Sequence, residues 1–324
     1  MRAIIVTRHG GPEVLELQDA ADPEPGPGQL LVDVEAAGVN FRDIYEREGQ
    51  GGYSAEPPLG AGAEGAGIVA AVGQGVRELE AGDRVAWSAA PGSYAEKVLV
   101  DETKAVPVPE GVSTEVAAAV LLQGMTAHYL ATDTYAVQSG DDVLVHAAAG
   151  GVGLLLTQIV KLLGGRVVAT TSSDEKAALA REAGADHTIG YDGFAERTRG
   201  LLGNRGVAVV YDGIGKDTFD ESLTALRPRG VMVLYGAASG AVPPVDPQRL
   251  NAGGSLFLTR PSLPHYTATR HELLARAAQV FGWIADRRLD VRIGARYPLT
   301  EARRAQEDLA ARKTTGKLIL EPKA

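Results

Sequence analysis

The 324-residue chain contains no cysteine. This absence excludes disulfide bonds, thiolate metal ligands and cysteine nucleophiles together, and it suits a reducing compartment. Apolar segments of the ~20 residues that cross a bilayer are also lacking, because glycine, proline or a charged residue interrupts each one. The apolar stretch at residues 1–7 is too short for a signal peptide. We therefore expect a cytoplasmic protein that does not enter a membrane.

Runs of lysine and arginine are absent too, and the formal net charge is −9. A nucleic-acid-binding surface is not expected, since such surfaces need clustered positive charge. The sequence has neither a His-Glu-x-x-His metal motif nor a Gly-x-Ser-x-Gly nucleophile elbow. These absences remove two common classes of hydrolase. His146 is expected to be a buried histidine whose hydrogen bonds are satisfied.

Two patterns of predicted elements divide the chain. With 45% hydrophobic residues, 324 residues can supply a core for each of two domains. The first part is typical of a partly open β-barrel, with short strands expected at residues 2–7, 14–18, 30–36, 66–72, 84–87 and 95–99. From about Gln123 strands alternate with helices, which predicts a doubly wound parallel sheet. Its strands are expected at 143–146, 166–170, 187–189, 207–211 and 231–235, and its helices at 154–163, 174–183 and 217–226. A strand at 255–259, helices at 271–287 and 302–312 and a closing strand at 317–320 complete the prediction.

A glycine-rich turn joins the strand predicted at 143–146 to the helix predicted at 154–163. Its sequence, Ala147-Ala148-Ala149-Gly150-Gly151-Val152-Gly153, fits a small-x-Gly-x-x-Gly pattern. Small residues let the backbone approach a phosphate, and the free N–H groups and dipole of the helix N-terminus stabilise its charge. The turn therefore predicts a Rossmann dinucleotide-binding domain, with the pyrophosphate against residues 150–153.

The end of the next predicted strand bears on the choice of nucleotide. An NAD-binding domain places Asp or Glu there to bind the ribose 2′-hydroxyl, whereas this chain has the neutral Thr171. Ser172, Ser173 and Lys176 could bind a 2′-phosphate through hydroxyl groups and positive charge, which predicts NADPH. An alternative is that the serines cap the following helix and that Lys176 is a solvated helix residue. The acidic pair at 174–175 would repel a phosphate unless both side chains point away.

Several stretches, found in order along nearly the whole chain, resemble the NADPH:quinone oxidoreductase (zeta-crystallin) family of medium-chain dehydrogenase/reductases. They are Gly11-Pro12-Glu13-Val14-Leu15, Gly38-Val39-Asn40-Phe41-Arg42-Asp43, Ala81-Gly82-Asp83-Arg84-Val85, Gln123-Gly124-Met125-Thr126-Ala127, the glycine turn, Tyr211-Asp212-Gly213-Ile214-Gly215 and Thr259-Arg260-Pro261-Ser262-Leu263. The resemblance implies an α/β fold with two domains. Residues 1–122 and 262–324 would form a GroES-like barrel domain, and residues 123–261 the Rossmann domain.

The residues at the zinc positions of metal-dependent relatives differ in this chain. Those relatives carry a cysteine where Asn40 stands and a histidine where Ala63 stands. A catalytic zinc needs three protein ligands, and alanine supplies none, so no metal is expected. Glu64 is expected to be a buried or paired carboxylate. Alcohol oxidation needs a Lewis acid or a strong base. Hydride delivery to an electrophilic acceptor requires fewer catalytic groups from the protein.

The resemblance also implies which residues line the site. Asn40, Phe41 and Tyr45 would face the nicotinamide from a short helix that begins at Asn40, with Tyr53 on the loop beyond it. Asn40, Tyr45 and Tyr53 are the candidate catalytic and acceptor-contact residues, although either tyrosine could serve in packing alone. Further cofactor contacts are implied at Gln123, Thr126, Tyr129, Tyr191, Gly236, Ser239 and Lys317.

The function expected from these residues is metal-free hydride transfer from NADPH to a quinone. An enoyl or alkenal reductase, which reduces a conjugated carbon–carbon double bond, is the alternative, so the acceptor is a small quinone or enone. A structural or RNA-binding role is a third interpretation, opposed by the acidic charge. The resemblance further implies a homodimer formed through the strand at 255–259.

Overall fold

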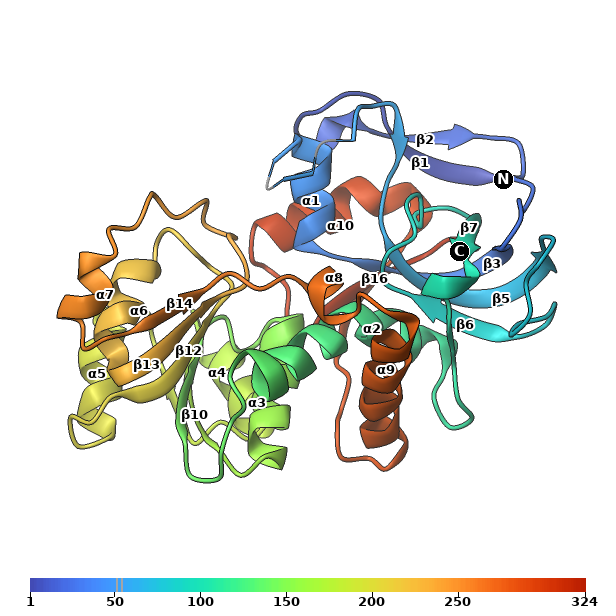
Figure 1. Ribbon diagram of the computed structural model, residues 1–324. Coiled ribbons are helices and arrows are strands. Elements are labelled where there is room, and N and C mark those ends of the chain that lie inside the picture. Colours follow the sequence, from blue (N-terminus) through green and yellow to red (C-terminus); the bar gives the residue numbers. More distant parts are fainter. Residues whose placement is uncertain (51, 54) are drawn as a thin grey trace. The chain divides into compact units, whose positions relative to one another are not determined.

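The computed structural model describes residues 1–50, 52–53 and 55–324, and the chain divides into two compact units (Figure 1). Unit 1 comprises Met1–Leu122, Thr267–Arg287 and Val291–Ala324. Unit 2 comprises Gln123–Tyr266 and Arg288–Asp290. The first division falls inside helix α2 (Thr114–Tyr129).

Unit 1 is built around the long strand β3 (Gln29–Val39), which pairs with three other strands. Its larger sheet has the order β15-β16-β3-β5-β6-β8, with β7 also paired to β3, and a smaller sheet has the order β2-β1-β4. The remaining strands are β1 (Arg2–Val6), β2 (Leu15–Asp19), β4 (Leu59–Gly60), β5 (Glu64–Val72), β6 (Arg84–Trp87), β7 (Lys97–Asp101), β8 (Val106–Pro107), β15 (Ile293–Pro298) and β16 (Lys317–Glu321). The helices of unit 1 are α1 (Phe41–Glu48), α9 (Arg270–Ala285) and α10 (Ala302–Ala310), with short 3-10 turns at Pro12–Val14, Glu102–Lys104 and Leu299–Glu301. Apolar side chains of β3, β5, β6 and β16 form one buried core.

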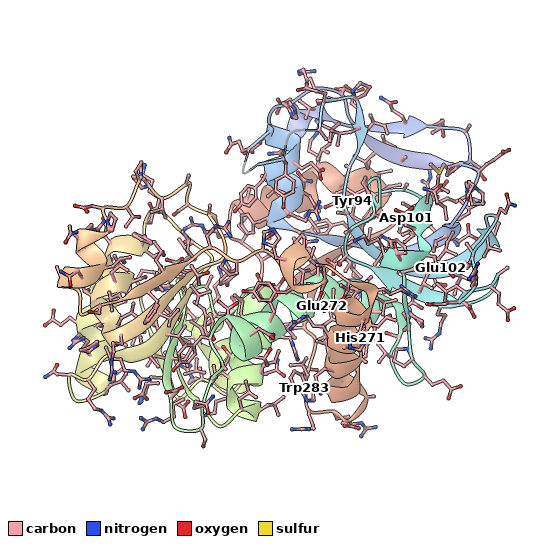
Figure 2. The ribbon with its side chains drawn as sticks, in the orientation of Figure 1. Tyr94, Asp101, Glu102, His271, Glu272 and Trp283 are labelled. Atoms are coloured by element: carbon pink, nitrogen blue, oxygen red, sulfur yellow. The ribbon has the colours of Figure 1, made fainter. Side chains whose placement is uncertain are left out.

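Helix α9 packs in unit 1 although it lies far along the chain from the strands that it contacts. Thr269 and Glu272 form a capping box at its start. The Arg270 guanidinium donates to the backbone carbonyls of Glu102 and Ala105 at 2.8 and 3.0 Å. Glu102, His271 and Glu272 are labelled in Figure 2. These hydrogen bonds tie the start of α9 to the segment after β7.

Unit 2 is a six-stranded parallel sheet with the order β11-β10-β9-β12-β13-β14. Its strands are β9 (Asp142–Val145), β10 (Arg166–Thr170), β11 (His187–Ile189), β12 (Val207–Asp212), β13 (Leu226–Leu234) and β14 (Phe257–Thr259). Its helices are α3 (Gly151–Leu162), α4 (Asp174–Glu182), α5 (Phe194–Leu201), α6 (Phe219–Ala225), α7 (Gln248–Ala252) and α8 (Leu263–Tyr266), and a π-helical turn at Leu130–Thr134 follows α2. Helices α3 and α4 pack together, as do α5 and α6, on the flanks of the sheet (Figure 1). The predicted α/β fold class, with a Rossmann domain and a β-rich domain, is confirmed.

Helix α2 is the main element that the sequence pattern did not predict. Its residues 117–121 have no exposed surface, so apolar side chains cover the whole circumference of the helix. A helix buried on all sides lacks the 3.6-residue alternation by which helices are recognised. Helix α5 and strand β15 were not predicted either. Among the described residues, no helix combines the length and the apolar character needed to cross a membrane.

Candidate active site

The glycine turn follows the carboxyl end of the central strand β9, as predicted. Gly150 is the N-cap residue of α3, and its amide donates to the Ala147 carbonyl at 2.9 Å. Ala147 itself has a φ of 49°, a left-handed conformation that costs a residue with a Cβ about 1 kcal/mol. The Tyr191 hydroxyl accepts a hydrogen bond from the Ala147 amide at 3.1 Å. Tyr191, which lies beyond β11, is therefore brought to the turn.

Glycine is required at Gly153 because backbone atoms occupy the space of a side chain, whereas at Gly151 a side chain would displace the end of the Gln123 side chain. A Cβ on Gly153 would lie 2.7 Å from Ala148 Cα and would overlap the Ala147 carbonyl oxygen. A Cβ on Gly151 would overlap the Gln123 side-chain amide. The backbone can therefore approach a phosphate closely at the N-terminus of α3, which is the geometry that a dinucleotide needs.

Three polar residues lie where β10 ends and α4 begins. The Lys176 ammonium lies 3.3 Å from Ser172 Oγ, and Ser173 Oγ accepts from the Lys176 amide at 3.3 Å as the N-cap. The capping interpretation therefore holds for Ser173. Asp174 and Glu175 are exposed in the first turn of α4. The neutral Thr171 is buried before them.

The other candidates of unit 2 lie on α2 and after β13. Gln123, Thr126 and Tyr129 are all buried on α2. The Tyr129 ring stacks on that of Tyr266, with centroids 4.2 Å apart and an interplanar angle of 7°. Ser239 Oγ donates to the Ile214 carbonyl at 2.9 Å, which joins the segment after β13 to the one after β12. Gly236, also after β13, lies against Gly213, and a Cβ there would be 2.8 Å from Gly213 Cα.

His146, at the end of β9, is fully buried, as expected. Its Nδ1 lies 2.8 Å from Thr170 Oγ1 and its Nε2 lies 2.9 Å from Ser222 Oγ. Burial lowers the pKa of His146 to about 4. The imidazole is therefore neutral at pH 7 and joins three elements of unit 2 from inside the core.

In unit 1, Asn40 lies between β3 and α1 and contacts a buried ion pair. The Lys317 ammonium lies 2.5 Å from Glu64 Oε2 and donates to Asn40 Oδ1 at 2.7 Å. Asn40 Nδ2 donates to Glu64 Oε2 at 2.9 Å and to the Gly38 carbonyl at 3.2 Å. The side chains of Glu64 and Lys317 are 0% and 1% exposed. Asn40, Glu64 and Lys317, which are far apart in the sequence, thus form one polar cluster. A contact of Lys317 with the cofactor remains a prediction.

A second buried network begins at Asp43, three residues after Asn40. Asp43 Oδ2 accepts from the Asn40 amide at 2.9 Å and from the Tyr94 hydroxyl at 2.8 Å; Tyr94 is labelled in Figure 2. Burial raises the pKa of Asp43 to about 6, against the opposing charge of Arg42. Burial, and the carboxylate of Asp43, also raise the pKa of Tyr94. The sequence pattern did not indicate this network, although the Asn40-x-x-Asp43 spacing resembles a capping box.

The raised pKa of Asp43 predicts an unusual dependence of stability on pH. In the unfolded chain this carboxyl ionises near pH 4, so between about pH 4 and 6 only the folded state keeps its proton. Its contribution to the free energy of unfolding therefore increases as the pH falls from 6 to 4, by up to about 3 kcal/mol. Urea unfolding of the wild type and of Asp43→Asn at pH 4–7 measures this contribution. The difference in unfolding free energy between the two proteins is expected to grow as the pH falls. A constant difference would contradict the assignment.

The aromatic candidates of unit 1 lie on α1 and beyond it. Phe41 and Tyr45 are half-buried, with ring centroids 6.4 Å apart. The Arg42 guanidinium lies over the Tyr53 ring, 5.3 Å from its centroid. Their contacts with an acceptor remain a prediction. Within residues 1–50, 52–53 and 55–324, no three His, Cys, Asp or Glu side chains converge as a metal site would require, and Glu64 pairs with Lys317 instead.

Comparison with known proteins identifies the class first. Residues 26–110 match the alcohol dehydrogenase GroES-like domain, and residues 151–273 match the zinc-binding dehydrogenase domain. A GroES-like domain followed by a Rossmann domain with a glycine turn defines a medium-chain dehydrogenase/reductase.

Similarity over nearly the full length then identifies the family. The chain is 46% identical to a quinone oxidoreductase of Pseudomonas aeruginosa, with 97% of each chain covered. It is 39% identical to a 2-haloacrylate reductase of a Burkholderia species, with 99% of each covered. A mycobacterial structure complexed with NADPH is 51% identical, with a TM-score of 0.96 over 99% of this chain and 100% of that one. The protein belongs to the quinone oxidoreductase family of the medium-chain dehydrogenase/reductases, as the sequence motifs predicted.

Proposed function

We propose that this protein is an NADPH-dependent quinone oxidoreductase that acts without a metal ion. The observation that carries the proposal is the phosphate-binding arrangement of unit 2. It combines a glycine cradle at α3, the neutral Thr171 at the end of β10, and Lys176 beside Ser172. The quinone oxidoreductase relative and the NADPH-bound mycobacterial structure support the same assignment.

The reaction is a two-electron reduction in which a quinone and NADPH with one proton yield a hydroquinone and NADP⁺. Bound NADPH supplies the hydride at its nicotinamide ring. The chain's own residues bind and orient. Residues 150–153 would hold the pyrophosphate at the N-terminus of α3, and Ser172, Lys176 and Tyr191 would bind the 2′-phosphate. Asn40, Tyr45 and Tyr53 contact the acceptor, and the aromatic rings offer a flat surface for a quinone.

Binding and turnover test the proposal together. Titration with NADPH and NADH, followed by the fluorescence of the nicotinamide, measures the preference between them. An acceptor panel of 1,4-benzoquinone, larger quinones and conjugated enals then measures kcat/KM for each. We expect NADPH to bind at least tenfold more tightly and quinones to be the better acceptors. A preference for NADH would overturn the cofactor assignment.

Reduction of a carbon–carbon double bond is the second candidate function. It is favoured by the relative named 2-haloacrylate reductase, which matches this chain over nearly its whole length. The same cofactor site would serve, and the acceptor would be a conjugated acid or carbonyl compound. A kcat/KM for 2-chloroacrylate or an enal that exceeds the value for every quinone in the panel would favour this candidate.

Lys176→Ala tests the phosphate contact. The ammonium forms a charge-assisted hydrogen bond with the 2′-phosphate, so its loss is expected to weaken NADPH binding by roughly 10- to 100-fold, or about 1.5–3 kcal/mol, and to leave NADH binding unchanged. The control is Arg181→Ala, which removes a positive charge near the other end of α4. Equal losses for both nucleotides would show that Lys176 does not contact the 2′-phosphate.

We further propose that the protein is a cytoplasmic homodimer that pairs through β14. This strand lies at the end of the sheet order, and Phe257 on it is 60% exposed. An exposed strand edge with a large apolar side chain favours pairing with a second copy. The cysteine-free sequence supports the cytoplasmic location.

Phe257→Lys is expected to shift the dimer to monomer, with a dissociation constant at least tenfold higher, because the introduced charge would be buried in the interface. Light scattering at several concentrations measures it. Leu201→Lys is the matched control, since Leu201 is an exposed apolar residue of unit 2 on α5. A variant that remains dimeric, or a wild type that is monomeric, would contradict the proposed interface.

A further inference from the structure

The ion pair of Glu64 and Lys317 is built into the sheet of unit 1. Glu64 begins β5 and is paired in register with Gly38 of β3, while Lys317 begins β16 on the opposite side of β3. Both side chains cross the Gly38 backbone between these strands. A Cβ on Gly38 would lie 2.8 Å from Lys317 Cε and would overlap a Glu64 carboxylate oxygen. The lack of a side chain at Gly38 therefore makes room for the pair.

The Glu64 carboxylate cannot rotate freely, because different elements hold its two oxygens. Oε1 accepts from the Leu122 amide of α2 at 2.7 Å, and Oε2 contacts Lys317 and Asn40. An ionised carboxylate has only acceptor sites, and an ammonium has only donor sites. The pair therefore presents a hydrogen-bond acceptor to one end of the Asn40 carboxamide and a donor to the other.

The placement of this acceptor and this donor determines how the Asn40 carboxamide is oriented. The oxygen and nitrogen of an amide have nearly the same shape, so only hydrogen-bond partners distinguish an orientation from its flipped form. Here Oδ1 accepts from the ammonium, whereas Nδ2 donates to the carboxylate. In the flipped form the NH₂ group would face the ammonium, and the oxygen would face both the carboxylate and the Gly38 carbonyl; such mismatches are costly in a buried site.

We propose that Glu64 and Lys317 are positioning residues that hold the Asn40 carboxamide in a single orientation for hydride transfer to the acceptor. The proposal rests on the proposed function, in which Asn40 contacts cofactor or acceptor. Asn40 directly precedes α1, the helix that carries Phe41 and Tyr45. An amide that is already fixed at this junction does not have to reorient during the reaction. Small misplacements of such groups lower rates by up to about 100-fold.

The test is a variant that removes the single orientation of the amide without leaving a buried charge. In Glu64→Gln/Lys317→Met, the introduced glutamine can keep its carbonyl oxygen on the Leu122 amide, which places its NH₂ group against Asn40 and favours the flipped carboxamide. The Gly38 carbonyl alone then favours the wild-type orientation, so the carboxamide is no longer held in one orientation. We expect kcat with the best quinone to fall by about 10- to 100-fold. The NADPH dissociation constant is expected to stay within about threefold of wild type, because the Lys317 side chain is 1% exposed and its ammonium is bonded to Glu64 and Asn40. A kcat equal to that of the wild type would overturn the proposal, whereas a purely structural role would not separate kcat from cofactor binding.

A double-mutant cycle shows whether the pair acts through Asn40. In an Asn40→Ala background, the double substitution is expected to lower kcat no further, because the group to be positioned is absent. Losses that multiply would mean that the pair acts independently, which overturns the proposal.

Side-chain amide NMR tests the orientation without turnover. The signals of the Asn40 Nδ2 hydrogens are assigned as those that the spectrum of Asn40→Ala lacks. These hydrogens are expected to exchange with solvent at least tenfold more slowly in the wild type than in Glu64→Gln/Lys317→Met. Equal exchange rates would overturn the proposal even if quinones are reduced. Slow exchange in a wild type that reduces no quinone would reject the proposed function alone.

Discussion

Replacing Lys317 by methionine is expected to lower the free energy of unfolding of unit 1 by about 3–5 kcal/mol. The substitution keeps most of the side-chain volume and removes the cation bonded to Glu64, whose side chain is 0% exposed. A buried carboxylate that loses its partner keeps its full desolvation cost. Both tryptophans of the chain, Trp87 and Trp283, belong to unit 1. Denaturant unfolding followed by tryptophan fluorescence therefore measures the effect in that unit.

Two variants make this prediction specific. Lys97→Met breaks surface pairs with Asp22 and Asp33, 3.0 and 3.6 Å apart, and is expected to cost much less stability, because exposed ion pairs contribute little. Glu64→Gln/Lys317→Met removes both charges, so it should recover most of the stability that Lys317→Met loses. If the single Lys317 variant were as stable as the Lys97 variant, the buried pair would not contribute to stability as we infer.

Replacing Gly153 by valine is expected to weaken NADPH binding by at least about 100-fold. The added Cβ would meet the backbone of residues 147–148, and backbone atoms cannot turn aside as a flexible side chain can. The first turn of α3 would have to move away from β9, which would displace the amides that hold the pyrophosphate. Binding is measured by fluorescence titration, and the unchanged unfolding of unit 1 shows that the effect is confined to unit 2.

Gly200→Val is the matched control. It places the same side chain in a helix of the same unit, where a Cβ meets nothing within 4 Å. We expect NADPH to bind this variant as it binds the wild type. NADPH binding by Gly153→Val as tight as that of the control would mean that the cofactor does not lie at the glycine turn.

The sequence by itself determined the elements whose signals are local. A glycine turn between an apolar strand and a helix has a distinctive composition, so the turn at 147–153 and the α/β fold class were predictable and are confirmed. The family followed from motifs spread along the whole chain, which full-length similarity to quinone oxidoreductases confirms. Helix α2 could not be predicted in this way, because burial on every side removes the periodicity that identifies a helix.

The tertiary structure alone decided which distant residues meet. Asn40, Glu64 and Lys317 lie on three strands or strand ends of one sheet, and no spacing in the sequence shows that β16 pairs beside β3. Glu64 was expected to be a buried or paired carboxylate, but the sequence does not name a partner. The raised pKa of Asp43 likewise depends on burial in the surrounding core, against the lowering effects of Arg42 and of the hydrogen bond from Tyr94. Local composition sets strands, turns and helices, whereas burial and partner choice arise only when the sheet brings remote side chains together.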